Sequence, residues 1–144
     1  MIGFFIALIS GALMSVQGVF NTQVTKVSGI WAASAFVQFS ALLVCLAAWA
    51  ATERGPLTAV FRVKPWYMLL GGVIGAFITY TVIKSMDMLG PATAVLLIVV
   101  AQLLVAYVIE LVGLFGADRQ PWEWRKAVGM AVAVIGIIIF RWKS

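Results

Sequence analysis

The chain has 144 residues and a net charge of +5, with 64% hydrophobic and 10% charged residues and a mean hydropathy of +1.10. Soluble domains are about 45–50% apolar and about 25% charged, so this composition excludes a water-soluble globule and predicts an all-α integral membrane protein, with residues 1–144 forming a single domain. The basic residues stand singly at the ends of apolar runs, which indicates lipid headgroups rather than nucleic acid as their partners.

Five stretches are long and apolar enough to cross a membrane, since a span needs about 20 mostly apolar residues. The first has neither a positively charged start nor a small-residue cleavage site, so we expect a retained span rather than a signal peptide. Tryptophans fall at several span ends, as in an aromatic belt. The predicted helices cover approximately residues 2–23, 30–51, 66–89, 92–115 and 127–142.

Five spans place the two termini on opposite sides of the membrane. The side of the N-terminus would hold six Lys and Arg residues and the opposite side four, which weakly favours a cytoplasmic N-terminus. So small a bias leaves two possibilities open, insertion in both directions and one fixed orientation. The two groups are Arg54, Arg62, Lys64, Arg119, Arg125 and Lys126 on the first side, and Lys26, Lys84, Arg141 and Lys143 on the second.

The first two predicted helices carry polar side chains inside the apolar runs. Gln17 and Asn21 are four residues apart and share one face of the first helix. Small residues such as Gly18 line the adjoining face and would let another helix approach closely. The polar pair either hydrogen-bonds to a neighbouring helix or lines a substrate cavity. Ser34 and Gln38 repeat the spacing in the second helix, where interhelical hydrogen bonding is favoured, although Gln38 is also a candidate for the cavity.

The third predicted helix begins with Gly71 and Gly75, a spacing typical of close helix packing. Tyr80, Lys84 and Asp87 then follow on one face. Lys84 and Asp87 are three residues apart, so we expect either an ion pair, which lowers the cost of holding both near the membrane, or a Lys84 side chain that extends to the interface. Tyr80 is a further candidate for the substrate site.

The fourth predicted helix contains Gln102 near its middle and Glu110 eight residues later on roughly the same side. A charge at the centre of a span costs about 2.5–3.5 kcal/mol to insert, and less near the edge. The carboxyl group can be protonated, can pair with a base such as Arg119, or can face a wet cavity. A proton or cation site and an interfacial anchor therefore both stay open. The fifth helix has a ridge of small residues over Gly129–Gly136, which predicts close packing.

No pattern for catalysis or metal binding is present in the sequence. Histidine is absent, which removes the commonest metal ligand and the usual general base near neutral pH. The single cysteine, Cys45, excludes an intrachain disulfide and is expected to be a small buried hydrophobe. Three of the five acidic residues lie in loops. We therefore expect neither an enzyme nor a bound cofactor or metal ion.

The order of these features resembles the short, YdcZ-type members of the drug/metabolite transporter superfamily, which also contains EamA-like permeases. The resemblance covers nearly the whole chain and departs from the family at Glu110, where aspartate is the more usual acid. It rests on the Gln17–Asn21 pair, on PWYMLLGGVIGAF (Pro65–Phe77), on LGPATA (Leu89–Ala94) and on the stretch from Ala101 to Ile139.

The resemblance implies a multi-pass protein of the bacterial inner membrane that is half of a ten-helix transporter with inverted repeats. We then expect a secondary transporter subunit for a small organic solute, working as an antiparallel homodimer or with a paralogous partner. Gln17, Asn21, Gln38, Gln102 and Tyr80 would line the cavity, and Glu110 would bind a proton or a cationic solute. A non-transporting scaffold and a flippase subunit for a lipid-linked molecule are the alternatives, and the sequence does not identify the substrate.

Overall fold

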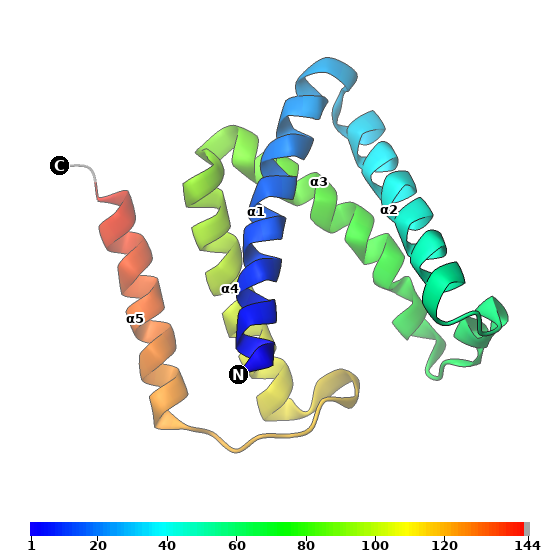
Figure 1. Ribbon diagram of the computed structural model, residues 1–144. Coiled ribbons are helices and arrows are strands. Elements are labelled where there is room, and N and C mark those ends of the chain that lie inside the picture. Colours follow the sequence, from blue (N-terminus) through cyan, green and yellow to red (C-terminus); the bar gives the residue numbers. More distant parts are fainter. Residues whose placement is uncertain (143–144) are drawn as a thin grey trace. The chain divides into compact units, whose positions relative to one another are not determined.

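The computed structural model describes residues 1–142, and its regular structure over that range is entirely helical (Figure 1). The chain divides into two compact units, one comprising Met1–Met88 and the other beginning at Leu89. Each unit has its own packed helices, α1 against α2 in the first and α4 against α5 in the second.

The first unit contains α1 (Ile2–Ser28), α2 (Ile30–Thr52) and α3 (Gly71–Leu89). Two short 3-10 helices, η1 (Leu57–Arg62) and η2 (Trp66–Leu70), connect α2 to α3. Helix α1 extends more than a turn beyond the predicted end near Gln23. It stops at Gly29, whose φ of 82° is a left-handed value that a residue with a Cβ rarely adopts. This single residue reverses the chain into α2.

Helices α1 and α2 form a hairpin that is packed at its closed end (Figure 1), and individual side chains of α3 contact both helices. On α1, a Cβ placed at Gly18 would lie 2.7 Å from the Met86 sulfur of α3, so the absence of a side chain permits this approach. The Trp31 ring of α2 stacks on Tyr80 of α3 with ring centroids 4.9 Å apart. Small and aromatic residues thus fix the three helices at this end.

The second unit contains α4 (Pro91–Val112), the short helix η3 (Leu114–Gly116) and α5 (Trp124–Arg141), with α4 packed against α5. Helix α4 ends three residues before the predicted boundary at Phe115, because Gly113 adopts a left-handed conformation with φ of 74°. Helix α5 begins at Trp124, before the predicted start at Ala127. Most of these differences arise at helix ends, where capping geometry decides the boundary.

Four helical segments are long and apolar enough to cross a membrane: Ile2–Ser28, Ile30–Thr52, Trp66–Leu89 and Pro91–Val112. Helix α5 is the fifth helix but is only 18 residues long and includes Arg125, Lys126 and Arg141. Its apolar part, from Ala127 to Phe140, extends about 21 Å at 1.5 Å per residue. That is shorter than a hydrocarbon layer of about 30 Å, and α5 is not among the four candidate spans.

Candidate functional site

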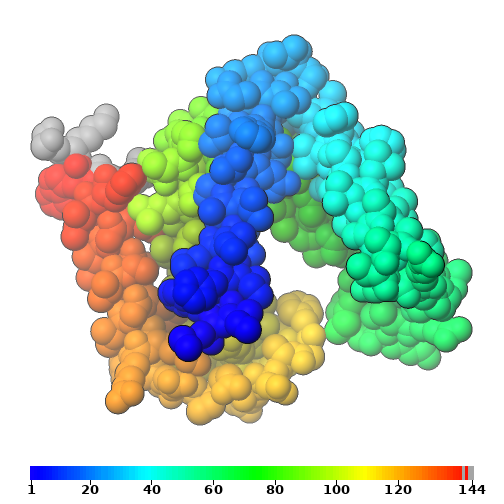
Figure 2. All heavy atoms as spheres, viewed as in Figure 1, coloured from blue at the N-terminus to red at the C-terminus, as the bar shows by residue number. Residues whose placement is uncertain are grey.

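The candidate residues Gln17 and Asn21 lie together in a groove between α1 and α2. The groove has a volume of about 530 Å³ and is otherwise mainly apolar. Figure 2 shows the surfaces of α1 and α2, coloured blue and cyan, diverging away from their joined ends. Asn21 is buried, with 8% of its surface exposed, whereas Gln17 is exposed. The remaining lining residues are Phe20, Val24, Phe36, Val37, Ser40, Ala41, Val44 and Cys45.

Cys45 is one of these lining residues and is exposed, so the expectation of a buried thiol is wrong. The helix pair of α1 and α2 opens toward its far end, which leaves the thiol uncovered. The Cys45 thiol therefore lies in the same groove as the Gln17 and Asn21 amides.

Gln38 does not line this groove. Its amide donates a hydrogen bond to the Thr79 hydroxyl of α3 at 3.3 Å, and that hydroxyl donates to the Gly75 carbonyl at 2.9 Å. Gly75 has only the Gln38 amide near the position of a Cβ, at 3.7 Å. The arrangement joins α2 to α3 and matches the interhelical role that the sequence favours for Gln38.

Tyr80 lines a different pocket, of about 250 Å³, where α1 ends, α2 begins and α3 ends. Lys84 and Asp87 line it as well, but no ion pair within 4.0 Å joins them among the described residues. The ion pair, one of the two arrangements expected for these residues, is therefore not formed, and both side chains are exposed at the pocket. The complete lining is Thr22, Thr25, Lys26, Ile30, Tyr80, Ile83, Lys84 and Asp87.

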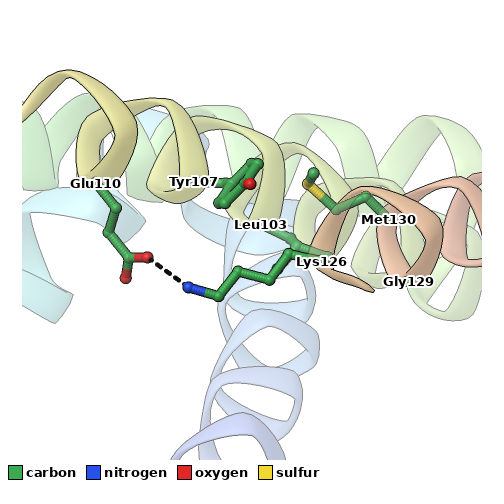
Figure 3. A pocket seen from close by; sticks show the side chains of 6 residues that line it. All are labelled: Leu103, Tyr107, Glu110, Lys126, Gly129 and Met130. Carbon is green, nitrogen blue, oxygen red and sulfur yellow. Dashed lines mark ion pairs between the residues drawn. The ribbon is translucent and has the colours of Figure 1, made fainter. Parts of the chain in front are cut away.

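In the second unit, Glu110 lies in a pocket of about 400 Å³ between α4 and α5 (Figure 3). Its carboxylate is 3.7 Å from the Lys126 ammonium, and the ammonium is also 3.3 Å from the Glu123 carboxylate. Lys126 lies in the first turn of α5, before the apolar part of that helix. Glu110 thus pairs with Lys126 rather than with Arg119, whose guanidinium donates to the Leu111 carbonyl.

Tyr107 is a buried side chain that lines the Glu110 pocket. It has 6% of its surface exposed, its hydroxyl accepts a hydrogen bond from the Glu123 backbone N–H at 3.1 Å, and its ring packs on Trp122. Sequence reasoning did not assign it this role. The available signal was its position three residues before Glu110, which places both on the same face of α4.

Gln102 is exposed on α4 and is not among the residues that line the Glu110 pocket. The eight-residue separation turns it by about 80° from Glu110 at 100° per residue. Leu103, which follows it, faces α5 instead (Figure 3). Gln102 and Glu110 therefore occupy neighbouring faces of one helix within this unit.

The comparison with protein families supports the resemblance noted in the sequence. A family model described as "Putative inner membrane exporter, YdcZ" matches residues 2–139. The chain belongs to this YdcZ family. No curated protein and no solved structure matches the chain.

Membership in the YdcZ family makes the chain an inner-membrane transporter-family protein and not a member of an enzyme family. The matched range contains all six candidate residues: Gln17, Asn21, Gln38, Tyr80, Gln102 and Glu110. The structure separates the four residues of the first unit into a groove, an interhelical hydrogen bond and a pocket at the helix ends. These four residues therefore do not form a single site within the first unit.

Proposed function

We propose that this YdcZ-family chain is a secondary transporter subunit that moves a small organic solute across the bacterial inner membrane. In this proposal α5 is the fifth span, and two five-helix chains in opposite orientation form a ten-helix transporter with its site near the midplane. Alternating access would come from rocking of the two chains around a shared cavity.

The groove of Gln17 and Asn21 is the observation that carries the proposal. Neither side-chain amide hydrogen-bonds to another described residue, and both lie in a groove of about 530 Å³. Ligand sites typically have volumes of about 300–1,000 Å³, mainly apolar walls and a few polar groups that orient the ligand. An unpaired amide facing hydrocarbon would be costly, so a solute, water or a second chain is expected to face these amides.

An opposed second chain is supported by two features. The basic residues are nearly balanced between the two sides, six against four, which suits insertion in both directions. The hydrophobic side chains are widely exposed, including Phe36 and Val44 beside the groove, so one chain leaves its groove open. A paralogous chain of opposite orientation would complete the groove equally well.

Glu110 is the proposed proton or cation site, and its pairing with Lys126 defines how it would act. A proton or a cationic solute that binds Glu110 has to replace the Lys126 ammonium, which then keeps Glu123 as its partner. The Glu110→Gln variant is expected to abolish transport while leaving the fold intact. Normal transport by this variant would make Glu110 an interfacial anchor.

The native thiol of Cys45 provides a test of the proposed cavity that does not require a known solute. Membrane vesicles are treated with a small, membrane-impermeant thiol reagent, from the outside alone and from both sides. If the groove is a water-filled cavity, Cys45 reacts with this reagent, although it lies about 10 Å inside the end of α2. The Gln17→Leu and Asn21→Leu variants should slow the reaction because they make the groove less polar.

Reaction of Cys45 only with a lipid-soluble thiol reagent would contradict the proposal. It would show that the groove is dry and faces lipid or a packed helix, as a scaffold subunit requires. A Cys45→Ala variant gives the background labelling, and a single cysteine introduced at exposed Ala117 shows that the soluble reagent reaches accessible thiols in the same vesicles.

A further inference from the structure

The pocket that contains Tyr80, with a volume of about 250 Å³, plays no part in the proposed transport cavity. It lies at the helix ends, since Lys26 is in the last turn of α1, Ile30 begins α2, and Lys84 and Asp87 precede the end of α3 at Leu89. Helix ends of a membrane protein lie at the level of the lipid headgroups. The pocket therefore faces phosphate groups rather than hydrocarbon.

The charges in this pocket are not neutralised by one another. Lys26, Lys84 and Asp87 all line it, yet none of the three forms an ion pair within 4.0 Å among the described residues. The two ammonium groups and one carboxylate give the pocket a formal charge of +1. Such a site favours a ligand with one negative charge, since basic pockets between membrane helices bind anionic headgroups.

The other polar groups restrict the ligand further. The Thr22 and Thr25 hydroxyls donate to the Gly18 and Asn21 carbonyls, at 2.8 Å each, so toward the pocket they offer only acceptor lone pairs. The Tyr80 hydroxyl donates no hydrogen bond to another described residue and is free to donate. The site thus combines donors for an anion with acceptors for a hydroxyl group.

We propose that this pocket binds a phosphodiester headgroup that carries a hydroxyl arm, of the phosphatidylglycerol type. Lys26 and Lys84 hold the phosphate, and Asp87 accepts a hydrogen bond from the arm. The volume of about 250 Å³ lies below the 300–1,000 Å³ typical of sites for drug-sized ligands, which suits a headgroup. The proposal is independent of the transported solute and would hold for a scaffold subunit as well.

The test uses the purified full chain in detergent and counts bound molecules by native mass spectrometry. The probes are short-chain phosphatidylglycerol, phosphatidylcholine with the same acyl chains, and glycerophosphoglycerol without acyl chains. The wild-type chain should bind phosphatidylglycerol more tightly than phosphatidylcholine, whose trimethylammonium group cannot donate to Asp87. Lys26→Gln and Lys84→Gln should each weaken the binding about tenfold, the loss expected for one charge-assisted hydrogen bond.

Matched variants separate the site from general charge effects. Arg62→Gln and Lys64→Gln remove the same charge from the connection between α2 and α3, outside the pocket lining, and should leave the affinity unchanged. Lys26→Arg and Lys84→Arg should retain the preference for phosphatidylglycerol and show that the folded site persists. Asp87→Asn should reduce the preference for the hydroxyl arm without abolishing phosphate binding.

The acyl-free compound identifies the source of the phosphodiester. Binding only with acyl chains assigns the site to a membrane lipid, and equal binding of glycerophosphoglycerol assigns it to a soluble phosphodiester, both of which support the proposed chemistry. Equal affinity of the wild-type chain and the Lys26→Gln/Lys84→Gln double variant for phosphatidylglycerol would overturn the proposal, provided that circular dichroism shows the same helix content.

Discussion

The distance of Glu110 from the end of α4 decides how costly its charge is in the membrane. The predicted end of α4 near Phe115 placed the carboxyl group about 7–8 Å inside the helix. The observed end at Val112 leaves it about 3 Å from the end, and Lys126 supplies a counter-charge at 3.7 Å. A carboxylate near a helix end with a counter-charge beside it costs far less to insert than a charge at the centre of a span.

The same pair leads to a prediction about stability. The side chains of Lys126 and Glu110 are 39% and 47% exposed, and ion pairs this open to solvent contribute little to folding. Glu110→Gln should therefore shift the thermal unfolding midpoint in detergent no more than Arg125→Gln, which removes a neighbouring exposed charge. A clearly larger shift for Glu110→Gln would show that the pair is held in a desolvated site.

Tyr107 should be more important for stability than the charged pair beside it. Its buried hydroxyl accepts the Glu123 N–H at 3.1 Å, at the residue that precedes α5. Tyr107→Phe removes this acceptor and should lower the free energy of unfolding by about 0.5–1.5 kcal/mol. Chemical unfolding followed by tryptophan fluorescence measures the change. Tyr67→Phe, at a residue with 45% exposure, is the control and should have almost no effect.

At the level of elements, the hydrophobic pattern predicts the positions of the helices, and local backbone geometry decides where they end. All five α-helices occur at predicted stretches, because a long apolar run in a membrane protein has to satisfy its backbone hydrogen bonds internally. The ends of α1 and α4 differ from the prediction because Gly29 and Gly113 adopt left-handed conformations. Hydropathy contains no information about which glycine takes that conformation.

The candidate site was predictable only in part, because the sequence gives the faces of each helix but not how the helices pack. Gln17 and Asn21 share one groove because residues four apart lie on one helix face. The contact of Gln38 with Thr79 depends on the packing of α2 against α3, as does the stacking of Trp31 on Tyr80. Lys84 and Asp87 had the right spacing for an ion pair, yet none within 4.0 Å joins them among the described residues, and both line a pocket at three helix ends. Helix periodicity predicts faces, whereas tertiary packing decides their partners.

Gly18 offers a test of the packing between α1 and α3. An added Cβ would lie 2.7 Å from the Met86 sulfur and 3.5 Å from Val82 Cγ1. Gly18→Ala should be tolerated because the flexible end of Met86 can move. Gly18→Leu has no comparable room and should destabilise the protein by about 1–3 kcal/mol, measured by chemical unfolding in detergent.

Gly11 is the matched position on the same helix, since nothing lies within 4 Å of an added Cβ there. Gly11→Leu should leave the free energy of unfolding nearly unchanged, or raise it slightly because a helical glycine is replaced. Equal destabilisation at both positions would indicate that the measured effect comes from leucine in α1 and not from contact with α3.

For the whole molecule, an antiparallel pair of identical chains requires that the chain inserts in both directions. The nearly balanced basic residues favour such insertion. A five-span chain has its α1–α2 turn and its α4–α5 loop on opposite sides of the membrane. If every chain has the same orientation, no two copies can form an inverted pair, and the groove of Gln17 and Asn21 requires a different partner. If the chain inserts both ways, the headgroup pocket occurs in both leaflets.

Two single-cysteine variants decide between these cases, both made in a Cys45→Ala background. Ser28→Cys places a thiol at the end of α1, and Ala117→Cys places one in the loop after η3, where both native residues are exposed. Intact cells are labelled with a membrane-impermeant thiol reagent before and after permeabilisation. Insertion in both directions predicts about half of the final labelling at each position in intact cells, because each thiol is outside in only one of two equally populated orientations. Complete labelling at one position and none at the other would establish a fixed orientation. The self-sufficient antiparallel homodimer would then be excluded, and the transporter would require an oppositely oriented second chain.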